Sequence, residues 1–464
     1  MSKLTLDNMA PALLALVLCA IDSPRDAYSL IAASSAFYRV FASSRERILS
    51  AVLKNAILPA ALPSALASIY VADIPEGQTE HLDSFLDSYF AGSTAFPTEM
   101  ARITDLSRLH LHASRFIDDY SSRALRALGP GLDLQPPTCT ERARFQRAFY
   151  RFELYSRINP VDYAVHGHSV LPAEAQFTKF LARMEPWEVE EMSCVHQYFS
   201  TLIEGFVDDL ENHLVEAVLG APGVRLPPSG RISPDHASSR GIENATRSGS
   251  VDDSTTQRAS QPVSAGPAYL VAFRKWDVRG LGLFSNYGRF RSPRYIGYLA
   301  SLGVRFFDAL ATATQEERTD LIRANSPAWC DFLPQALEAA PGDGPKTVQP
   351  ADLDDQPSHA NLGYYLYKPS DREVYIGIVN DGALDVSNCP LRQLGFVFWD
   401  AARISMPAVA AQLRNAQRMD HAEANALFNR SARESAEDRL MGVMIPAIEM
   451  EKIVDEFESV LSSW

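Results

Sequence analysis

A cysteine and a histidine lie close together inside an acidic stretch of the sequence. Cys194 and His196 are two positions apart, and a thiol beside an imidazole can act as a nucleophile with its base. Residues 186–219 predict one long helix, on which positions two apart face different ways. Its acidic residues include Glu188, Glu190, Glu191, Glu204, Asp208, Asp209 and Glu211. We expect them to form a solvated helix face rather than a carboxylate metal site, because no pair of histidine ligands accompanies them.

Two histidine pairs are further candidates for metal binding. His110 and His112 are two apart in a predicted helix, and His166 and His168 flank a glycine in a loop-like segment. Histidines at this spacing could share a metal on a strand, whereas on a helix they point to different faces. We therefore expect hydrogen-bonded histidines and no metal ligand.

Motifs for phosphate binding and for hydrolysis are incomplete. Residues 341–346 read Pro-Gly-Asp-Gly-Pro-Lys, with the wrong spacing and a proline where a backbone amide should bind phosphate. Gly280-Leu281-Gly282 lacks the third glycine of a dinucleotide fingerprint, and neither GxSxG nor HExxH occurs. The sequence therefore predicts no catalytic residue, no cofactor and no metal.

Residues 273–295 interleave cations with aromatic rings, a pattern in which cations can bind phosphates while rings stack on bases. Its members are Arg274, Lys275, Arg279, Arg289, Arg291 and Arg294 with Phe273, Trp276, Phe284, Tyr287, Phe290 and Tyr295. The formal net charge of the chain is −14, which opposes binding to nucleic acid. We expect an irregular loop, with its aromatic side chains in the core and its arginines paired with acids, and no nucleic-acid partner.

The composition of the 464-residue chain is that of a folded globular protein, since 46% of its residues are hydrophobic and 22% are charged. The five cysteines lie far apart without a CxxC pair, which favours free thiols in a reducing compartment. We therefore expect an intracellular protein, cytoplasmic or nuclear. No stretch approaches the roughly 20 apolar residues that span a bilayer, so no membrane association is expected.

An apolar run near the start of the chain leaves secretion open as an alternative. Residues 9–21 are almost entirely apolar and follow Lys3, so they could form the central region of a secretory signal. Asp7 precedes the run, and the pattern continues smoothly into residues 21–41, as in a folded domain. We expect a folded helix here, whereas a mature chain beginning near Ser23 would indicate secretion.

Apolar periodicity predicts a mainly α-helical fold. The expected helices cover residues 9–21, 24–33, 35–41, 44–56, 78–90, 98–127, 139–157, 186–219, 292–312, 314–324, 327–339, 391–404, 407–430, 433–443 and 447–462. The best strand lies at 372–379 before the turn Asn380-Asp381-Gly382, which allows at most a minor β-hairpin near 372–388. No internal repeat is found, so the common repeat architectures are excluded.

Changes in composition along the chain predict four segments. Residues 1–43 form a three-helix motif, and residues 44–220 form the first half of an irregular multi-helix body. Residues 221–267 are rich in Ser, Pro, Gly, Asp and Arg and lack an apolar period, which predicts a disordered linker. Residues 268–464 form the second half of the body and contain a polar loop at 340–358.

The three-helix motif carries more apolar side chains than it can bury within itself. Three helices in about 35 residues are too few for an adequate core, so these side chains must pack on the following helices or on a partner. The expected partner-binding residues are Met9, Pro11, Leu13, Leu14, Val17, Leu18, Ile21, Leu30 and Ile31.

Residues 9–41 resemble an F-box, a motif that packs on the small adaptor subunit of a cullin-type ubiquitin ligase. The matching positions are Met9, Leu13, Val17 and Ile21, then Leu30, Ala33, Ser34 and Phe37. Ala10 and Ala12 replace the usual proline and acidic residue, and Ala27 replaces the usual leucine. The resemblance implies docking on that subunit, and the alternative is packing on residues 44–127 of the same chain.

Three further strings resemble a large family of F-box-like proteins from filamentous fungi: residues 141–155, 186–192 and 391–400. Together with residues 9–41, this resemblance spans most of the chain apart from the two polar ranges. It implies an F-box-like hairpin on a helical body. Because that family has no established substrate or chemistry, it implies no mechanism.

Three functional hypotheses follow. The chain is a substrate-recruiting adaptor of a ubiquitin ligase, whose hairpin binds the adaptor subunit and whose body binds an unknown protein client. Alternatively, it is a helical scaffold without a ligase role, or an enzyme with a non-local site. A contiguous exposed apolar patch on the first three helices would favour docking, and full coverage by the same chain would favour the scaffold.

Overall fold

The computed structural model describes residues 9–74, 79–129, 134–162, 168–169, 171–227, 269–271, 293–325, 332–339, 361–367, 390–419, 439–440 and 442–453. Within these residues the fold is mainly α-helical, as predicted. The predicted β-hairpin at 372–388 and the polar loop at 340–358 lie outside the described residues. So do linker residues 228–267 and most of the basic and aromatic segment at 273–295.

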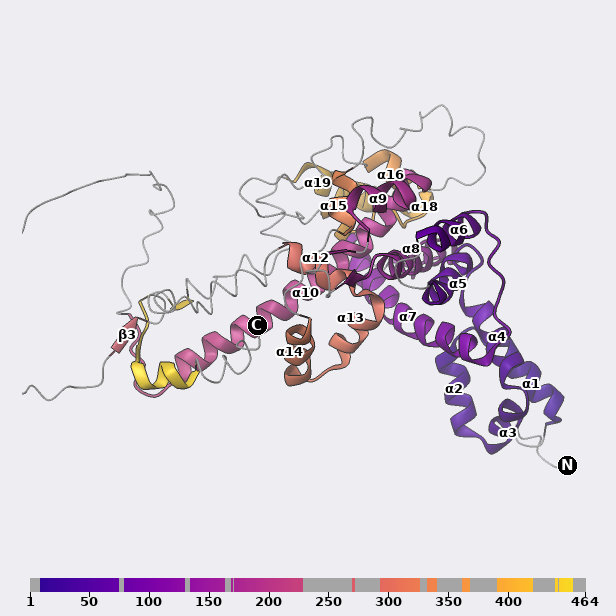
Figure 1. The fold of residues 1–464 in the computed structure, drawn as a ribbon, viewed down its shortest axis with the longest axis horizontal. Coiled ribbons are helices and arrows are strands. Elements are labelled where there is room, and N and C mark those ends of the chain that lie inside the picture. The colour runs from indigo at the N-terminus through magenta and orange to yellow at the C-terminus, as the bar shows by residue number, and fades with distance from the viewer. Residues whose placement is uncertain are drawn as a thin grey trace, which may run out of the picture. The chain divides into compact units, whose positions relative to one another are not determined.

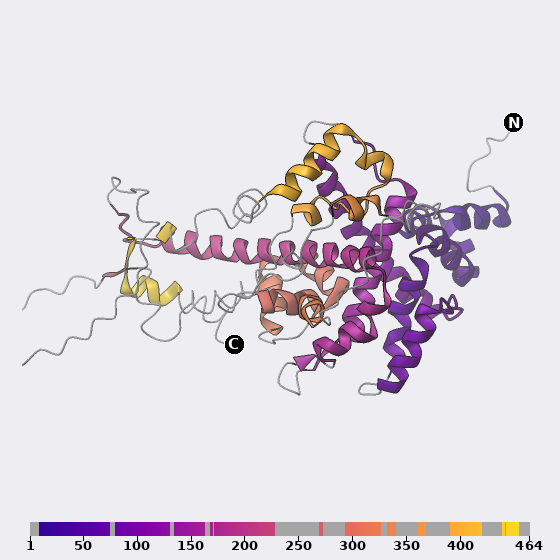
Figure 2. The same ribbon diagram turned by 90° about the horizontal axis from the view of Figure 1, so that it is seen from above.

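The chain divides into two compact units, which do not coincide with the four predicted ranges. The first unit comprises Met1–Asp208 and Gly288–Arg433, and the second comprises Asp209–Tyr287 and Glu434–Ser463. Both halves of the predicted body therefore contribute to the first unit. The boundary falls within helix α10 (Pro186–Gly220), which Figure 2 shows as one uninterrupted helix.

The first unit begins with a run of helices that ends at Ile158 (Figure 1). These are α1 (Pro11–Ala20), α2 (Pro24–Ala33), α3 (Ser35–Ser43), α4 (Arg45–Ala56), α5 (Leu62–Tyr70), the 3-10 helix η2 (Val71–Asp73), α6 (Thr79–Phe90), α7 (Met100–Leu128) and α8 (Cys139–Ile158). Side-chain hydrogen bonds to free backbone amides fix where two of these helices begin. Ser23 accepts a hydrogen bond from the Asp26 amide at 3.2 Å before α2, and Thr138 and Glu141 cap α8 reciprocally.

The remaining helices are α9 (Ala173–Lys179), η4 (Leu181–Arg183), α12 (Pro293–Ser301), α13 (Gly303–Thr312), α14 (Gln315–Ala324), α15 (Leu333–Glu338), α16 (Leu362–Tyr367), α17 (Pro390–Gln393), α18 (Ala401–Ile404) and α19 (Pro407–Arg418). Two short antiparallel ladders pair β1 (Val161–Asp162) with β2 (His168–Ser169), and β3 (Tyr269–Val271) with β4 (Met444–Pro446). Neither the ladders nor α5, α9 and α16 were predicted, because apolar periodicity is weak in elements shorter than about ten residues.

The prediction of a single helix at 292–312 is wrong, because the helix is interrupted at Leu302 and α13 begins at Gly303. Gly303 has a φ of 78°, which side chains disfavour, and a Cβ there would lie 2.6 Å from Glu153 Oε2. The same oxygen accepts a hydrogen bond from the Val304 amide at 2.7 Å. A carboxylate of α8 thus occupies the positive end of α13. The helix predicted at 391–404 is likewise divided, with Gly395 at a φ of 62°.

An aromatic cluster around α8 forms the core of the first unit. The aromatic side chains predicted on one face of this helix are all buried: Phe145, Phe149, Phe152 and Tyr155. Phe149 meets Phe199 of α10 edge to face, with ring centroids 5.7 Å apart. Phe145 stacks on Phe398 at 4.0 Å. These contacts make α8 the helix on which α10 and the segment after α17 pack.

A close backbone approach in α16 gives the first stability test. A Cβ at Gly363 would clash with the carbonyl oxygen of Phe396, which is backbone and cannot move independently. We expect Gly363→Ala to lower the free energy of unfolding by about 2–4 kcal/mol. Gly205→Ala in α10 is the matched control, because nothing lies within 4 Å of its Cβ position. Urea unfolding followed by circular dichroism measures both, and equal midpoints would contradict the close approach.

Candidate functional site

The acidic residues at the start of α10 are buried in ion pairs, so the predicted solvated face is wrong for this part of the helix. Glu190 and Glu191 are fully buried. Arg392 donates to both oxygens of Glu190, at 2.7 and 3.1 Å, and Arg147 of α8 donates to both oxygens of Glu191, at 3.0 and 2.5 Å. Two-bond contact with a guanidinium group offsets the cost of removing a carboxylate from water. These ion pairs could not be predicted from the sequence, because the arginines lie 202 and 44 positions away from the glutamates.

A further buried pair joins the start of α8 to α18. Arg403 donates to both oxygens of Glu141, at 2.8 and 2.7 Å, and the amides of Thr138 and Asp400 donate to the same carboxylate. Burial alone would raise the pKa of Glu141, but the hydrogen bonds from Arg403 and the two amides hold this pKa below its usual value. Glu141 is therefore held in its charged form.

We call these three pairs the ion-pair layer. Its members are Glu141, Arg147, Glu190, Glu191, Arg392 and Arg403. The pairs connect three segments that are far apart in the sequence: helix α8, the start of α10 and residues 392–403. The layer binds charges of the chain to one another, so its groups are already occupied.

Cys194 and His196 lie on α10 in different surroundings. Both side chains are buried. Cys194 lies beside Tyr120, whereas the His196 ring lies 6.3 Å from Phe152 and 6.0 Å from Phe332 between ring centroids. Burial, with a smaller effect of the Arg392 charge, lowers the pKa of His196 to about 3. This histidine is therefore neutral within an aromatic environment.

The arrangement most like a nucleophile with its base lies on α7, where no sequence pattern indicated it because Tyr150 is 40 positions from His110. His110 lies between two hydroxyls, with Nε2 3.2 Å from Ser114 Oγ and Nδ1 2.6 Å from the Tyr150 hydroxyl. Burial lowers the pKa of His110 to about 4, so the ring is neutral near pH 7. His112 faces elsewhere and contacts Asp308 at 2.8 Å. Both ring nitrogens of His110 bond within the core, which makes it a link between α7 and α8.

His168 lies in β2, and His166 lies outside the described residues. Among the described side chains, no group of three or more His, Cys, Asp or Glu residues could hold a metal ion. None of the helices in the described ranges is both long and apolar enough to cross a membrane.

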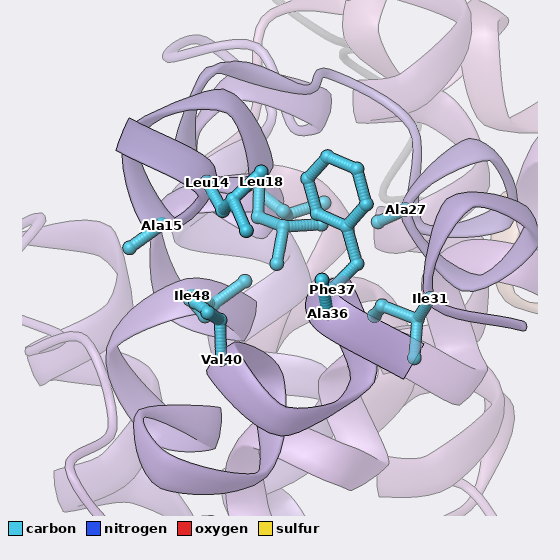
Figure 3. Packing of buried hydrophobic residues seen from close by; sticks show 10 residues of the cluster. Leu14, Ala15, Leu18, Ala27, Ile31, Ala36, Phe37, Val40 and Ile48 are labelled. Carbon is cyan, nitrogen blue, oxygen red and sulfur yellow. The ribbon is translucent and has the colours of Figure 1, made fainter. Parts of the chain in front are cut away.

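The N-terminal hairpin, defined as α1–α3, packs on α4 around a core of its own (Figure 3). Buried side chains from all four helices form this core: Leu14, Ala15, Leu18, Ala27, Ile31, Ala36, Phe37, Val40, Ile48 and Val52. Met9, Cys19, Ile21, Leu30 and Phe41 are partly buried against it. The hairpin core is therefore closed by the chain itself, through α4.

Two side-chain amides couple the hairpin to the body. Asn55 of α4 donates from Nδ2 to the carbonyl oxygens of Cys19 and Ile21, at 2.9 and 3.1 Å, where α1 ends. Gln146 of α8 is buried. Its side chain donates a hydrogen bond to the carbonyl oxygen of Ala56 at 2.9 Å and accepts one from the backbone amide of Leu58 at 2.8 Å. Helix ends leave carbonyl oxygens without backbone partners. These amides satisfy them and fix α1 to α4, and α4 to α8.

The opposite face of α1 is apolar and exposed. Leu13, Leu16 and Val17 have exposed fractions of 48%, 63% and 37%. Their spacing places them in one stripe along the helix, and exposed Ala12 and Ala20 extend it. We call Leu13, Leu16 and Val17 the α1 stripe. No residue of α1 is charged, so the stripe is uninterrupted by polar groups of its own helix.

The expected partner-binding residues divide between these two faces of the hairpin. Leu14, Leu18 and Ile31 are buried, Met9, Ile21 and Leu30 are partly buried, and Pro11, Leu13 and Val17 are exposed. Leu16 was missed, because a helix that is apolar all round gives no sign of which face points outward. The hairpin thus combines a covered core with an exposed stripe.

Comparison of the chain with models of known protein families, with curated proteins and with solved structures finds no match. The geometry of the chain itself is therefore the basis for a functional proposal.

Removing one charge from the ion-pair layer should destabilise the protein strongly. Glu190→Gln removes the charge that faces the buried guanidinium of Arg392. We expect the free energy of unfolding to fall by about 3–5 kcal/mol. Glu46→Gln, which alters an exposed carboxylate of α4, should change it by less than about 0.5 kcal/mol. Urea unfolding measures both, and similar values for the two variants would argue against the layer as a structural element.

The two buried histidines should make the protein less stable in acid. Their pKa values of about 4 for His110 and about 3 for His196 lie below the usual 6.5. As the pH falls below about 6.5, the unfolded chain binds protons that the folded chain does not bind. The contribution of the two histidines to the free energy of unfolding is therefore greatest above about pH 6.5 and is lost as the pH falls to about 3–4. Each histidine contributes on the order of 3–5 kcal/mol of the decline.

Replacing one histidine tests this. His196→Leu should flatten the decline between about pH 6.5 and pH 4, because the unfolded chain then has one proton fewer to bind. His81→Gln, at an exposed position of α6, should leave the slope unchanged. Unfolding midpoints in urea are measured at each pH. A decline in His196→Leu that runs parallel to the wild type would show that His196 is not the source.

Proposed function

We propose that this chain is a substrate-recruiting adaptor of a cullin-type ubiquitin ligase and that its N-terminal hairpin docks on the small adaptor subunit of that ligase. The residues that resemble an F-box, 9–41, coincide with α1–α3. The helical body of the first unit binds a protein client. Ubiquitin transfer then takes place on other subunits, so no residue of this chain acts in catalysis.

The observation that carries this proposal is the exposed α1 stripe. The hairpin core is closed by inward residues such as Leu14 and Leu18 and by α4, so the stripe adds nothing to it. Complete burial of a leucine or valine side chain contributes about 1.5–3 kcal/mol. Covering what remains exposed on three such residues therefore favours docking by on the order of 3 kcal/mol. An uninterrupted apolar face of this kind is typical of a protein-interaction site.

The second candidate function is a helical scaffold without a ligase role. It is favoured by the way α4 closes the hairpin core with Ile48 and Val52 and binds the end of α1 through Asn55. A hairpin held in this way needs no partner in order to fold. The two functions differ in what the α1 stripe does, since a scaffold of this kind leaves it in contact with water.

Charges placed on the α1 stripe should abolish docking and leave the fold intact. We expect Leu13→Asp with Val17→Asp to lose capture of the full-length chain by the recombinant adaptor subunit, because a buried unpaired carboxylate costs several kcal/mol. Leu111→Asp with Leu366→Asp is the matched control, since these leucines are 42% and 53% exposed on α7 and α16. The control should be captured like the wild type.

Thermal unfolding of both double variants separates docking from folding. Unfolding temperatures within a few degrees of the wild type show that the hairpin core is intact. Capture of the stripe variant at the wild-type level, or no capture of the wild type at all, contradicts the ligase adaptor and favours the scaffold.

A further inference from the structure

The hairpin and α4 carry charged groups that the rest of the described chain does not neutralise. Residues 9–56 contain three carboxylates and a larger set of cations: Arg25, Arg39, Arg45, Arg47 and Lys54. All of these cations are exposed, and none forms an ion pair within the part of the chain that the structure describes. The chain as a whole has a formal net charge of −14. A locally basic element is therefore attached to an acidic protein.

The contrast with α8 shows that this is not the general state of arginine in this protein. Arg142, Arg144, Arg147, Arg151 and Arg157 each contact a carboxylate of the chain within 3.0 Å. On the hairpin and α4, Arg39 donates only to the Ser35 carbonyl among the described contacts. The guanidinium carbon of Arg45 lies 5.6 Å from the centroid of the Phe41 ring. Neither charge is neutralised by a carboxylate among the described residues.

The position of these arginines relates them to the α1 stripe. Arg39 lies on α3, and Arg45 and Arg47 lie in the first turn of α4. Both helices pack directly on α1, and packed helices have axes about 8–10 Å apart. The electrostatic screening length at physiological ionic strength is about 8 Å. A protein surface that covers the stripe and extends onto α3 and the start of α4 would meet these cations.

We propose that the surface which covers the α1 stripe is an acidic protein surface, with an apolar centre against Leu13, Leu16 and Val17 and carboxylates at its rim opposite Arg39, Arg45 and Arg47. This inference rests on the proposed function, because it describes the partner that docks there. An apolar centre with a polar rim is the usual anatomy of a protein interface. Arginine suits the rim, since its planar group binds a carboxylate through two hydrogen bonds.

A protein partner fits better than an anionic membrane or a nucleic acid. The stripe contains three large side chains, which is less apolar area than a helix lying in a membrane surface normally buries. The net charge of −14 repels both phosphate-rich alternatives at long range. A local basic rim avoids this penalty when its target is a single acidic patch on a protein.

The test measures association rates between the full-length chain and the immobilised adaptor subunit as salt is varied. A carboxylate rim predicts an association rate that falls about tenfold between about 50 and 500 mM NaCl. Arg39→Glu with Arg47→Glu should slow association by about tenfold or more at low salt. Arg126→Glu with Arg414→Glu is the matched control: both are exposed, unpaired among the described residues, and change the net charge equally. The control should change the rate by less than about threefold.

The outcomes separate this inference from the proposed function. Association that is slowed by Arg39→Glu with Arg47→Glu but not by the control, with an unchanged unfolding temperature, supports the acidic rim. Equal effects of the two pairs, or association independent of salt, overturn it, while loss of binding in Leu13→Asp with Val17→Asp still supports the ligase adaptor. Absence of wild-type binding overturns both. Sedimentation with phosphatidylserine vesicles that requires Arg39 and Arg47 would also overturn it, by assigning the cations to a lipid surface.

Discussion

The arrangement of the first unit depends on buried two-bond contacts between arginine and glutamate. Glu141, Glu190 and Glu191 leave water only where a guanidinium group takes the place of solvent. A shift of one segment against another would bury an unpaired charge at a cost of several kcal/mol, whereas apolar packing tolerates small shifts. The ion-pair layer therefore sets the register between segments up to 262 residues apart.

The same logic extends from the layer to the hairpin. Helix α8 carries Glu141 and Arg147 of the layer, and Gln146 between them holds the end of α4. Asn55 near that end holds α1 in turn. Each step pairs a buried or helix-terminal backbone group with a side chain of defined length, so little freedom remains between α8 and the α1 stripe. In the proposed adaptor, this keeps the docking surface at a fixed position relative to the body of the first unit.

The sequence predicted local features well and long-range ones poorly. The starts and ends of α1–α4 and of α6–α8 lie within two residues of the prediction, because proline, serine and threonine at the first positions and apolar periodicity are local signals. The acids of α10 were placed in water, because nothing near them in the sequence reveals Arg147 or Arg392. The break at Gly303 depends on Glu153 of α8, which is equally remote. The sequence marked the first helix as apolar throughout, but only packing shows that Leu14 faces the core and Leu16 faces water.

The chemistry of α1 has a consequence for the choice between adaptor and scaffold. A helix that is apolar on all sides is normally enclosed on all sides, yet half of α1 faces water. Polar residues at the positions of the α1 stripe would leave the hairpin core untouched and reduce self-association. Leu13, Leu16 and Val17 are not members of the hairpin core and keep 48%, 63% and 37% of their surface exposed. In the proposed adaptor, a second surface covers these side chains and supplies carboxylates to the neighbouring arginines, which form no ion pair among the described residues.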